Sequence, residues 1–476
     1  MIGRRIAIGA ACAAVTAAFA HGFGQRYDLP LPLSLYLVGA ALTVAVSCVM
    51  LVAFVRAAPK DGRFPHIDLL AHAPARALAS TPVLAAVRLA GVALFVLVIV
   101  AGFAGNPSPF RNIVPITVWA LWWVGLAYFS ALIGDVWKVA NPLDTLFAAA
   151  ERAYSRLRGG KRLCLEWTAP PWLQAWPAVV LYLAFLWMEM VWEGSDSPAR
   201  IAAAIVAYSA LTWAGMGLFG REVWLERGEV FSRVFGTLAR FSPTHVRIED
   251  RRVVEWHLRP PAVGLLESHP VDASGMMLVI TILAAVSFDG FLETPAWASL
   301  AAALTGGDEP TSWPRTLGLI AAPLLFLGVY LFFCRLIAIC GGLPRSRRIA
   351  GLFVLTLVPI AIAYFIAHYL SFLAMAGQYL VPLASDPLGR GWDLFGTANY
   401  FVRMGMVDAR AVWIISVGAI VAGHIAALYL GHLLSMREFA HRRSAALSQV
   451  PMLVLMVAYT MLSLWIIAQP IVSNRG

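Results

Sequence analysis

The side chains best suited to chemistry in this sequence are carboxylates and histidines that lie within or beside long apolar segments. In chain order they are His21, Glu189, Asp289, Glu293, His368 and His424. Asp289 and Glu293 are four residues apart, so a helix would place both on one face. An ionisable group at the centre of a membrane helix costs about 2.5–3.5 kcal/mol, which makes each such group a functional candidate.

Imidazoles combined with carboxylates are a suitable ligand set for a divalent metal, copper or zinc, which would lower the pKa of a bound water. The metal ligands in this hypothesis are His21, His368 and His424. The catalytic carboxylates are Asp289, Glu293 and Glu189. The chain contains no HExxH or similarly compact motif, so the ligands would have to come from separate helices.

Two other interpretations of the same residues stay open. Buried carboxylates and histidines relay charge in proton- or ion-coupled transporters and in metal-handling membrane proteins. Alternatively, the carboxylates reach water at the membrane surface and the histidines are satisfied by neighbouring hydroxyls or carbonyls. Turnover of a substrate, uptake into vesicles, or neither would separate the three.

The composition identifies the elements that must position these residues. Of 476 residues, 60% are hydrophobic and only 13% are charged, which is more apolar surface than a soluble core can bury. These figures exclude intrinsic disorder, a disulfide scaffold and a coiled coil. They predict an all-α, polytopic bundle of transmembrane helices, since backbone amides in a bilayer need internal partners.

Ten apolar segments are long enough to cross the bilayer, which constitutes the lipid partner of the chain. They are 33–55, 83–104, 114–134, 172–192, 201–219, 276–291, 316–339, 350–375, 411–434 and 451–468. On this assignment Glu189, Asp289, Glu293 and His368 lie toward the outer side, with His424 near mid-membrane.

Lysine and arginine concentrate in alternate loops, which predicts that those loops lie inside and that both mature termini are periplasmic. The net charge of +10 is therefore an orientation signal, and no nucleic-acid partner is expected. In the inner loop 220–275, Glu222, Glu226, Glu229 and Arg233 have helical spacing, which predicts an amphipathic helix with a solvated charged face.

The first twenty residues have the pattern of a signal peptide. Arg4 and Arg5 precede a short apolar run, and Ala18-Phe19-Ala20 is a typical cleavage site. Cleavage would leave 21–476 as one membrane domain in the bacterial inner membrane, with His21 first. An N-terminal histidine can chelate an ion through its amine and its ring, as in the histidine brace of copper proteins. The alternative is an uncleaved first helix.

The outer loop 376–410 alternates glycine and proline with aromatic and charged residues, which predicts an ordered segment. Its candidate residues are Asp386, Arg390, Trp392 and Asp393. They would either order the loop as a lid or contact the substrate.

Several stretches make the chain resemble bacterial multi-pass membrane proteins of the fenitrothion hydrolase type. The first is His21-Gly-Phe-Gly-Gln-Arg-Tyr-Asp-Leu-Pro30, and the others are 219–232, 288–295, 378–400 and 451–470. The resemblance implies a membrane-bound organophosphate (phosphotriester) hydrolase that acts with a second subunit. It also implies a small apolar substrate, which a site in the outer leaflet would meet in the bilayer.

Overall fold

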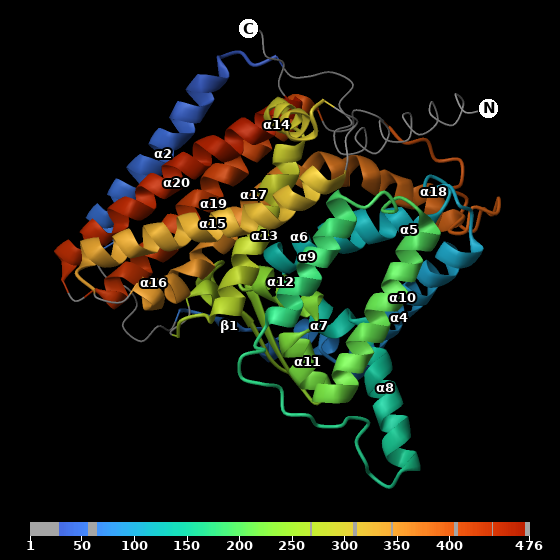
Figure 1. Ribbon diagram of the computed structural model, residues 1–476. Helices are drawn as coiled ribbons and strands as arrows, with labels where there is room; N and C mark the ends of the chain where they lie inside the picture. The colour runs from blue at the N-terminus through green and yellow to red at the C-terminus, as the bar shows by residue number, and fades with distance from the viewer. Residues whose placement is uncertain are drawn as a thin grey trace.

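The computed structural model describes residues 28–55, 64–266, 269–307, 312–343, 346–403, 408–439 and 441–471. The predicted signal peptide, 1–20, and the predicted metal ligand His21 lie outside these described residues. Helices dominate the described part of the chain, which confirms the all-α prediction (Figure 1).

Nine helical stretches in the described ranges are long and apolar enough to cross a membrane. They are Leu33–Phe54 (α2), Thr81–Ala104 (α4), Ile113–Leu132, Pro198–Phe219 (α10), Ala273–Leu292 (α13), Ser312–Gly341 (α15), Ser346–Ser385, Ala409–Glu438 (α19) and Arg442–Gln469 in α20 (Arg442–Ile471). These helices fit a multi-pass membrane protein.

The fourth of the ten predicted segments forms a shorter helix than the other nine. That segment forms α9 (Trp176–Met190), which has 15 residues and is therefore about 22 Å long. A hydrocarbon core is about 30 Å thick, so α9 alone falls short of crossing it. The predicted segment 172–192 extended beyond the helix because the flanking residues Trp172, Leu173, Ala175, Val191 and Trp192 are also apolar.

Two of the spans are interrupted by other helical geometries. Ile113–Leu132 consists of α5 (Ile113–Ile116), a π-helix labelled η2 (Thr117–Gly125) and α6 (Leu126–Leu132). Ser346–Ser385 consists of α16 (Ser346–Phe353), the 3-10 turn η4 (Val354–Leu357), α17 (Val358–Ala376), the 3-10 turn η5 (Gly377–Tyr379) and α18 (Leu380–Ser385). Pro359 in the first turn of α17 explains the first break, since proline lacks an amide proton.

Helices α13 and α17 form the centre of the bundle, because most of their residues are buried. Helix α13 packs against α9, α15 and α17, and α17 packs also against α19 and η2. In Figure 1, α2, α15, α19 and α20 lie on one side of this centre and α4 and α10 on the other. Side chains on α9, α13, α17 and η2 can therefore meet inside the protein.

Several short elements connect the longer helices. They are β1 (Ile67–Asp68), the 3-10 turn η1 (Leu69–Ala71), α3 (Ala73–Leu78), α7 (Trp137–Ala140) and α8 (Pro142–Leu157). The strands β2 (Thr244–Glu249) and β3 (Arg252–Leu258) pair antiparallel, and β1 adds to β3 in the order β1-β3-β2. The remaining elements are the 3-10 turn η3 (Val263–Leu265) and α14 (Pro295–Thr305), which follows α13.

The predicted amphipathic helix of the loop 220–275 is two helices, α11 (Arg221–Arg227) and α12 (Val230–Ala239). Helix α12 packs against α6, α7 and α9, with Phe231, Val234 and Phe235 buried. Glu222 and Glu226 are exposed, as predicted for a solvated face. Glu229 is fully buried, so that prediction is wrong for this residue.

Candidate functional site

Three of the candidate side chains meet where α9, α13 and α17 come together. Asp289 Oδ2 lies 2.9 Å from Nε2 of His368. The Tyr369 hydroxyl donates to Asp289 Oδ2 at 2.7 Å and lies 3.3 Å from Glu189 Oε1. Glu189, Asp289 and His368 are thus joined in one hydrogen-bonded chain through Tyr369.

Trp123 of the π-helix completes this chain, because its indole Nε1 donates to Glu189 Oε1 at 2.7 Å. The other carboxylate oxygen of Glu189, Oε2, is buried and has no hydrogen-bond partner among the described residues. A single hydroxyl proton on Tyr369 serves two carboxylates. Glu189 is consequently the member of the chain with the most capacity left to bind or release a proton.

This hydrogen-bonded chain is more exposed at Asp289 than at His368. The Asp289 side chain is 22% exposed and that of His368 only 8%. A Cβ on Gly290 would lie 2.8 Å from the Tyr364 hydroxyl and 3.5 Å from His368 Nδ1. A glycine at this position therefore lets the α17 side chains approach the α13 backbone closely.

Glu293 lies at the C-terminal end of α13, one turn beyond Asp289, and is exposed. The protein removes water from one side of its carboxyl, and this effect raises the pKa of Glu293. The negative charge of Asp289 raises the pKa further. A carboxyl group with a raised pKa is suited to donate a proton to a bound molecule.

The predicted metal ligand His424 lies apart, on α19. Its Nδ1 lies 2.7 Å from the carbonyl oxygen of Ile420 and therefore donates to it, while Nε2 is buried without a partner among the described residues. The His424 ring lies 5.8 Å from the ring of Tyr459, whose hydroxyl lies 2.5 Å from Ser287 Oγ. Within the described residues, no group of three His, Cys, Asp or Glu side chains is arranged to hold a metal ion.

The loop predicted as a lid is ordered by its own polar residues. Asp386 accepts hydrogen bonds from the backbone amides of Arg390 and Gly391, at 2.8 and 2.7 Å. The Arg390 guanidinium donates to the Ala104 carbonyl at 3.1 Å and lies 5.8 Å from the ring centre of Trp392. Asp393 Oδ1 accepts from the Ala398 amide at 3.0 Å. These contacts order the loop and attach it to the end of α4.

Sequence reasoning missed Tyr369 and Trp123, which connect the carboxylates. Tryptophans are typical of helix ends in membrane proteins, where they anchor at the membrane surface, and a tyrosine within an apolar run carries no signal of its own. The adjacency of Tyr369 to His368 was the one hint available. Which helix faces they share is decided by packing, and apolar periodicity in a membrane does not specify it.

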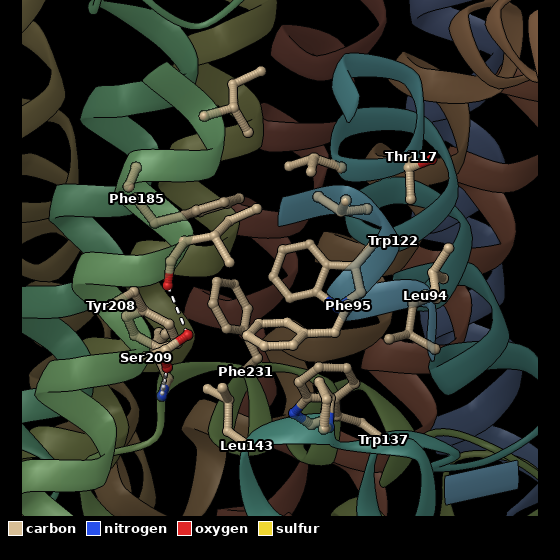
Figure 2. Close-up of a pocket in the computed structure, with 18 of the residues that line it drawn as sticks. Leu94, Phe95, Thr117, Trp122, Trp137, Leu143, Phe185, Tyr208, Ser209 and Phe231 are labelled. Atoms are coloured by element: carbon tan, nitrogen blue, oxygen red, sulfur yellow. Dashed lines mark hydrogen bonds between the residues drawn. The ribbon is translucent and has the colours of Figure 1, made fainter. Parts of the chain in front are cut away.

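A large apolar cavity lies next to the hydrogen-bonded chain that joins Glu189 to His368. It is enclosed between η2, α9, α4 and α10 (Figure 2). Its volume is about 710 Å³. Phe185 of α9 lines the cavity and lies 4.8 Å, centre to centre, from the ring of Trp123. Phe185 thus connects the cavity wall to Trp123, the hydrogen-bond donor to Glu189.

Comparison of the chain with models of protein families, with curated proteins and with solved structures found no match. The geometry of the described residues is accordingly the basis for the functional proposal.

Proposed function

We propose that this protein is a membrane-embedded hydrolase component that acts on apolar, phosphotriester-like substrates from the periplasmic side. The observation that carries the proposal is the Asp289–His368 pair, in which an imidazole holds a partly exposed carboxylate in place. The resemblance of the N-terminal motif to proteins of the fenitrothion hydrolase type supports the substrate class.

In the proposed reaction, Asp289 accepts a proton from the attacking water. The water oxygen forms a bond to phosphorus while the bond between phosphorus and the leaving-group oxygen breaks. Glu293 donates its proton to the leaving oxygen, a role favoured by its raised pKa. His368 and Tyr369 orient the Asp289 carboxylate. After the reaction Asp289 releases its proton to external water and Glu293 takes up a proton, which restores the starting state.

A divalent metal remains a prediction, and no step above passes through one. Among the described residues, Asp289 and His368 could supply two donors, and the third predicted ligand, His21, lies outside the described residues. Metal analysis of the purified mature protein and of His21→Ala tests this prediction. Equal, negligible metal contents in two active preparations would refute it.

Purified protein should release nitrophenolate from diethyl 4-nitrophenyl phosphate. Asp289→Asn should lower kcat by about 100-fold or more, because general base catalysis contributes about 10²–10⁴-fold. Asp408→Asn is the matched control, since Asp408 is exposed at the start of α19 and its side chain makes no capping hydrogen bond. Equal activity of both variants would refute the proposed role of Asp289.

The second candidate function is proton-coupled transport, which one observation favours. A series of buried polar groups extends from the Asp289–His368 pair through Tyr364 and the Ser287–Tyr459 pair to His424. Tyr364 OH and His424 Nε2 have no partner among the described residues, so either can take part in proton transfer. Proton flux in proteoliposomes that His424→Gln abolishes, without phosphotriester turnover, would favour transport over hydrolysis.

A further inference from the structure

The cavity between η2, α9, α4 and α10 has the properties of a ligand site. A volume of about 710 Å³ lies within the range typical of small-molecule pockets, about 300–1,000 Å³. Helices α7, α8 and α12 close one end of it through Trp137, Leu143 and Phe231. Figure 2 shows the side chains of Trp122, Phe95 and Phe231 directed into the same space.

The lining specifies a neutral ligand with aromatic character. No charged side chain is among the described residues that line the cavity. The aromatic residues of the lining are Phe95, Trp119, Trp122, Phe129, Trp137, Phe185, Tyr208 and Phe231. Aromatic rings attract one another edge to face beyond simple burial, whereas a saturated chain gains only the burial.

The edge of the cavity indicates that a ligand enters from the bilayer. Leu121, Phe129 and Leu211 line the cavity and are 42%, 40% and 44% exposed. All three belong to helices long and apolar enough to cross a membrane, so their exposed surfaces face lipid. Molecules dissolved in the hydrocarbon thus reach the cavity without passing through water.

The π-helix that forms one wall of the cavity departs from ordinary helical hydrogen bonding. Thr117, at the start of the π-helix, lines the cavity, is 2% exposed, and its hydroxyl has no partner among the described residues. The hydroxyls of Thr281 and Thr460, by contrast, donate to carbonyls four residues earlier in their helices. The Thr117 oxygen is covered by protein atoms, and the π-helix that carries it, a geometry frequent at functional sites, forms this wall of the cavity.

We propose that this cavity binds a neutral aromatic molecule that enters from the bilayer. In the proposed hydrolase, the cavity holds the apolar part of the substrate, and this role rests on the proposed function. Phe185 of the lining packs against Trp123, the hydrogen-bond donor to Glu189, and so links the cavity to the hydrogen-bonded chain. Binding itself does not depend on turnover.

The test measures binding of N-phenyl-1-naphthylamine, a neutral aromatic probe, to the protein in phospholipid nanodiscs, with empty nanodiscs as background. We expect saturable binding of one probe per protein. Ala204→Phe places a ring in the cavity from α10 and should weaken binding at least about 10-fold. Ala203→Phe is the matched control, because Ala203 is exposed on the same helix and outside the lining.

A second variant keeps the proposal falsifiable if Ala204→Phe fails to fold. Leu94→Trp fills the cavity from α4 and should also weaken binding at least about 10-fold. No saturable binding, or equal binding by the Ala203 and Ala204 variants, would overturn the proposal. Displacement of the probe by an equal concentration of palmitoyl lysophosphatidylcholine would identify an acyl chain as the occupant and also overturn it. Specific binding without phosphotriester turnover would refute the proposed function alone.

Discussion

Glu229 allows a stability prediction whose size follows from its contacts. The residue is 0% exposed, and its carboxylate accepts six hydrogen bonds from groups on four helical segments. Oε1 accepts from the Tyr208 hydroxyl at 2.6 Å and the Phe231 amide at 3.2 Å. Oε2 accepts from Trp137 Nε1, Asn141 Nδ2, and the amide and hydroxyl of Ser232. Glu229 therefore holds α12 against α7, α8 and α10.

The variant Glu229→Gln keeps the size of the side chain and replaces one oxygen by an amide group. With the amide at the position of Oε1, the Tyr208 hydroxyl can turn to accept, but the Phe231 amide loses its acceptor. A buried donor left without a partner costs about 1–3 kcal/mol, and the remaining bonds lose their charge assistance, about 1 kcal/mol each at most. We expect a free energy of unfolding lower by about 2–4 kcal/mol.

The measurement is reversible unfolding of the detergent-solubilised protein by added SDS, followed by tryptophan fluorescence. Glu226→Gln is the control, since Glu226 lies three residues away and is exposed, and it should change the free energy by less than about 0.5 kcal/mol. Equal stability of the two variants would refute the reasoning, because it would mean that the buried carboxylate contributes nothing that a neutral amide cannot replace.

Three further predictions concern packing, pH and the loop. A Cβ on Gly423 would lie 2.4 Å from that of Ala363, so Gly423→Ala should force α19 from α17 and lower stability by about 1–3 kcal/mol in the same unfolding assay. Burial raises the pKa of Asp135 despite the opposing charge of Lys138, so its ionised form destabilises the folded protein. Stability should fall as the pH rises from the unfolded-state pKa toward the higher folded-state pKa, and thermal unfolding of Asp135→Asn should lack this decline. Asp386→Ala removes the acceptor of two backbone amides in the loop and should increase proteolytic cleavage there, with unchanged cleavage contradicting its ordering role.

Part of the candidate site could be predicted from the chain alone. The positions of Glu189, Asp289 and His368 within their apolar segments placed all three toward one side of the bundle. That depth follows from hydropathy and charge, which are properties of each segment by itself. The rotation of each helix about its axis is not such a property. In lipid, every face of a helix is apolar, so no amphipathic pattern indicates which face meets a neighbour.

The same reason accounts for the errors. Glu229 and Glu226 have the same residue type and a helical spacing, yet one is fully buried and the other is exposed. The difference arises because α12 packs inward against α6 and α9, where Tyr208, Trp137 and Asn141 are available to the Glu229 carboxylate. Likewise, the length of α9 depends on where its backbone hydrogen bonds stop. Because the loops on both sides of α9 are also apolar, the hydropathy pattern does not show where the helix ends.

The sequence by itself determined that the chain is a bundle of apolar helices with a few costly ionisable groups. The preference of each segment for the bilayer is the sum of contributions from its own residues, and a backbone in the bilayer must form helices. Only the tertiary structure decided that Asp289, His368 and Glu189 share one hydrogen-bonded chain through Tyr369. It also decided that a cavity lined by aromatic residues lies beside Phe185, which packs against Trp123. Both features depend on which faces of helices far apart in the sequence contact one another. Packing selects those faces, and the apolar pattern of each helix does not specify them.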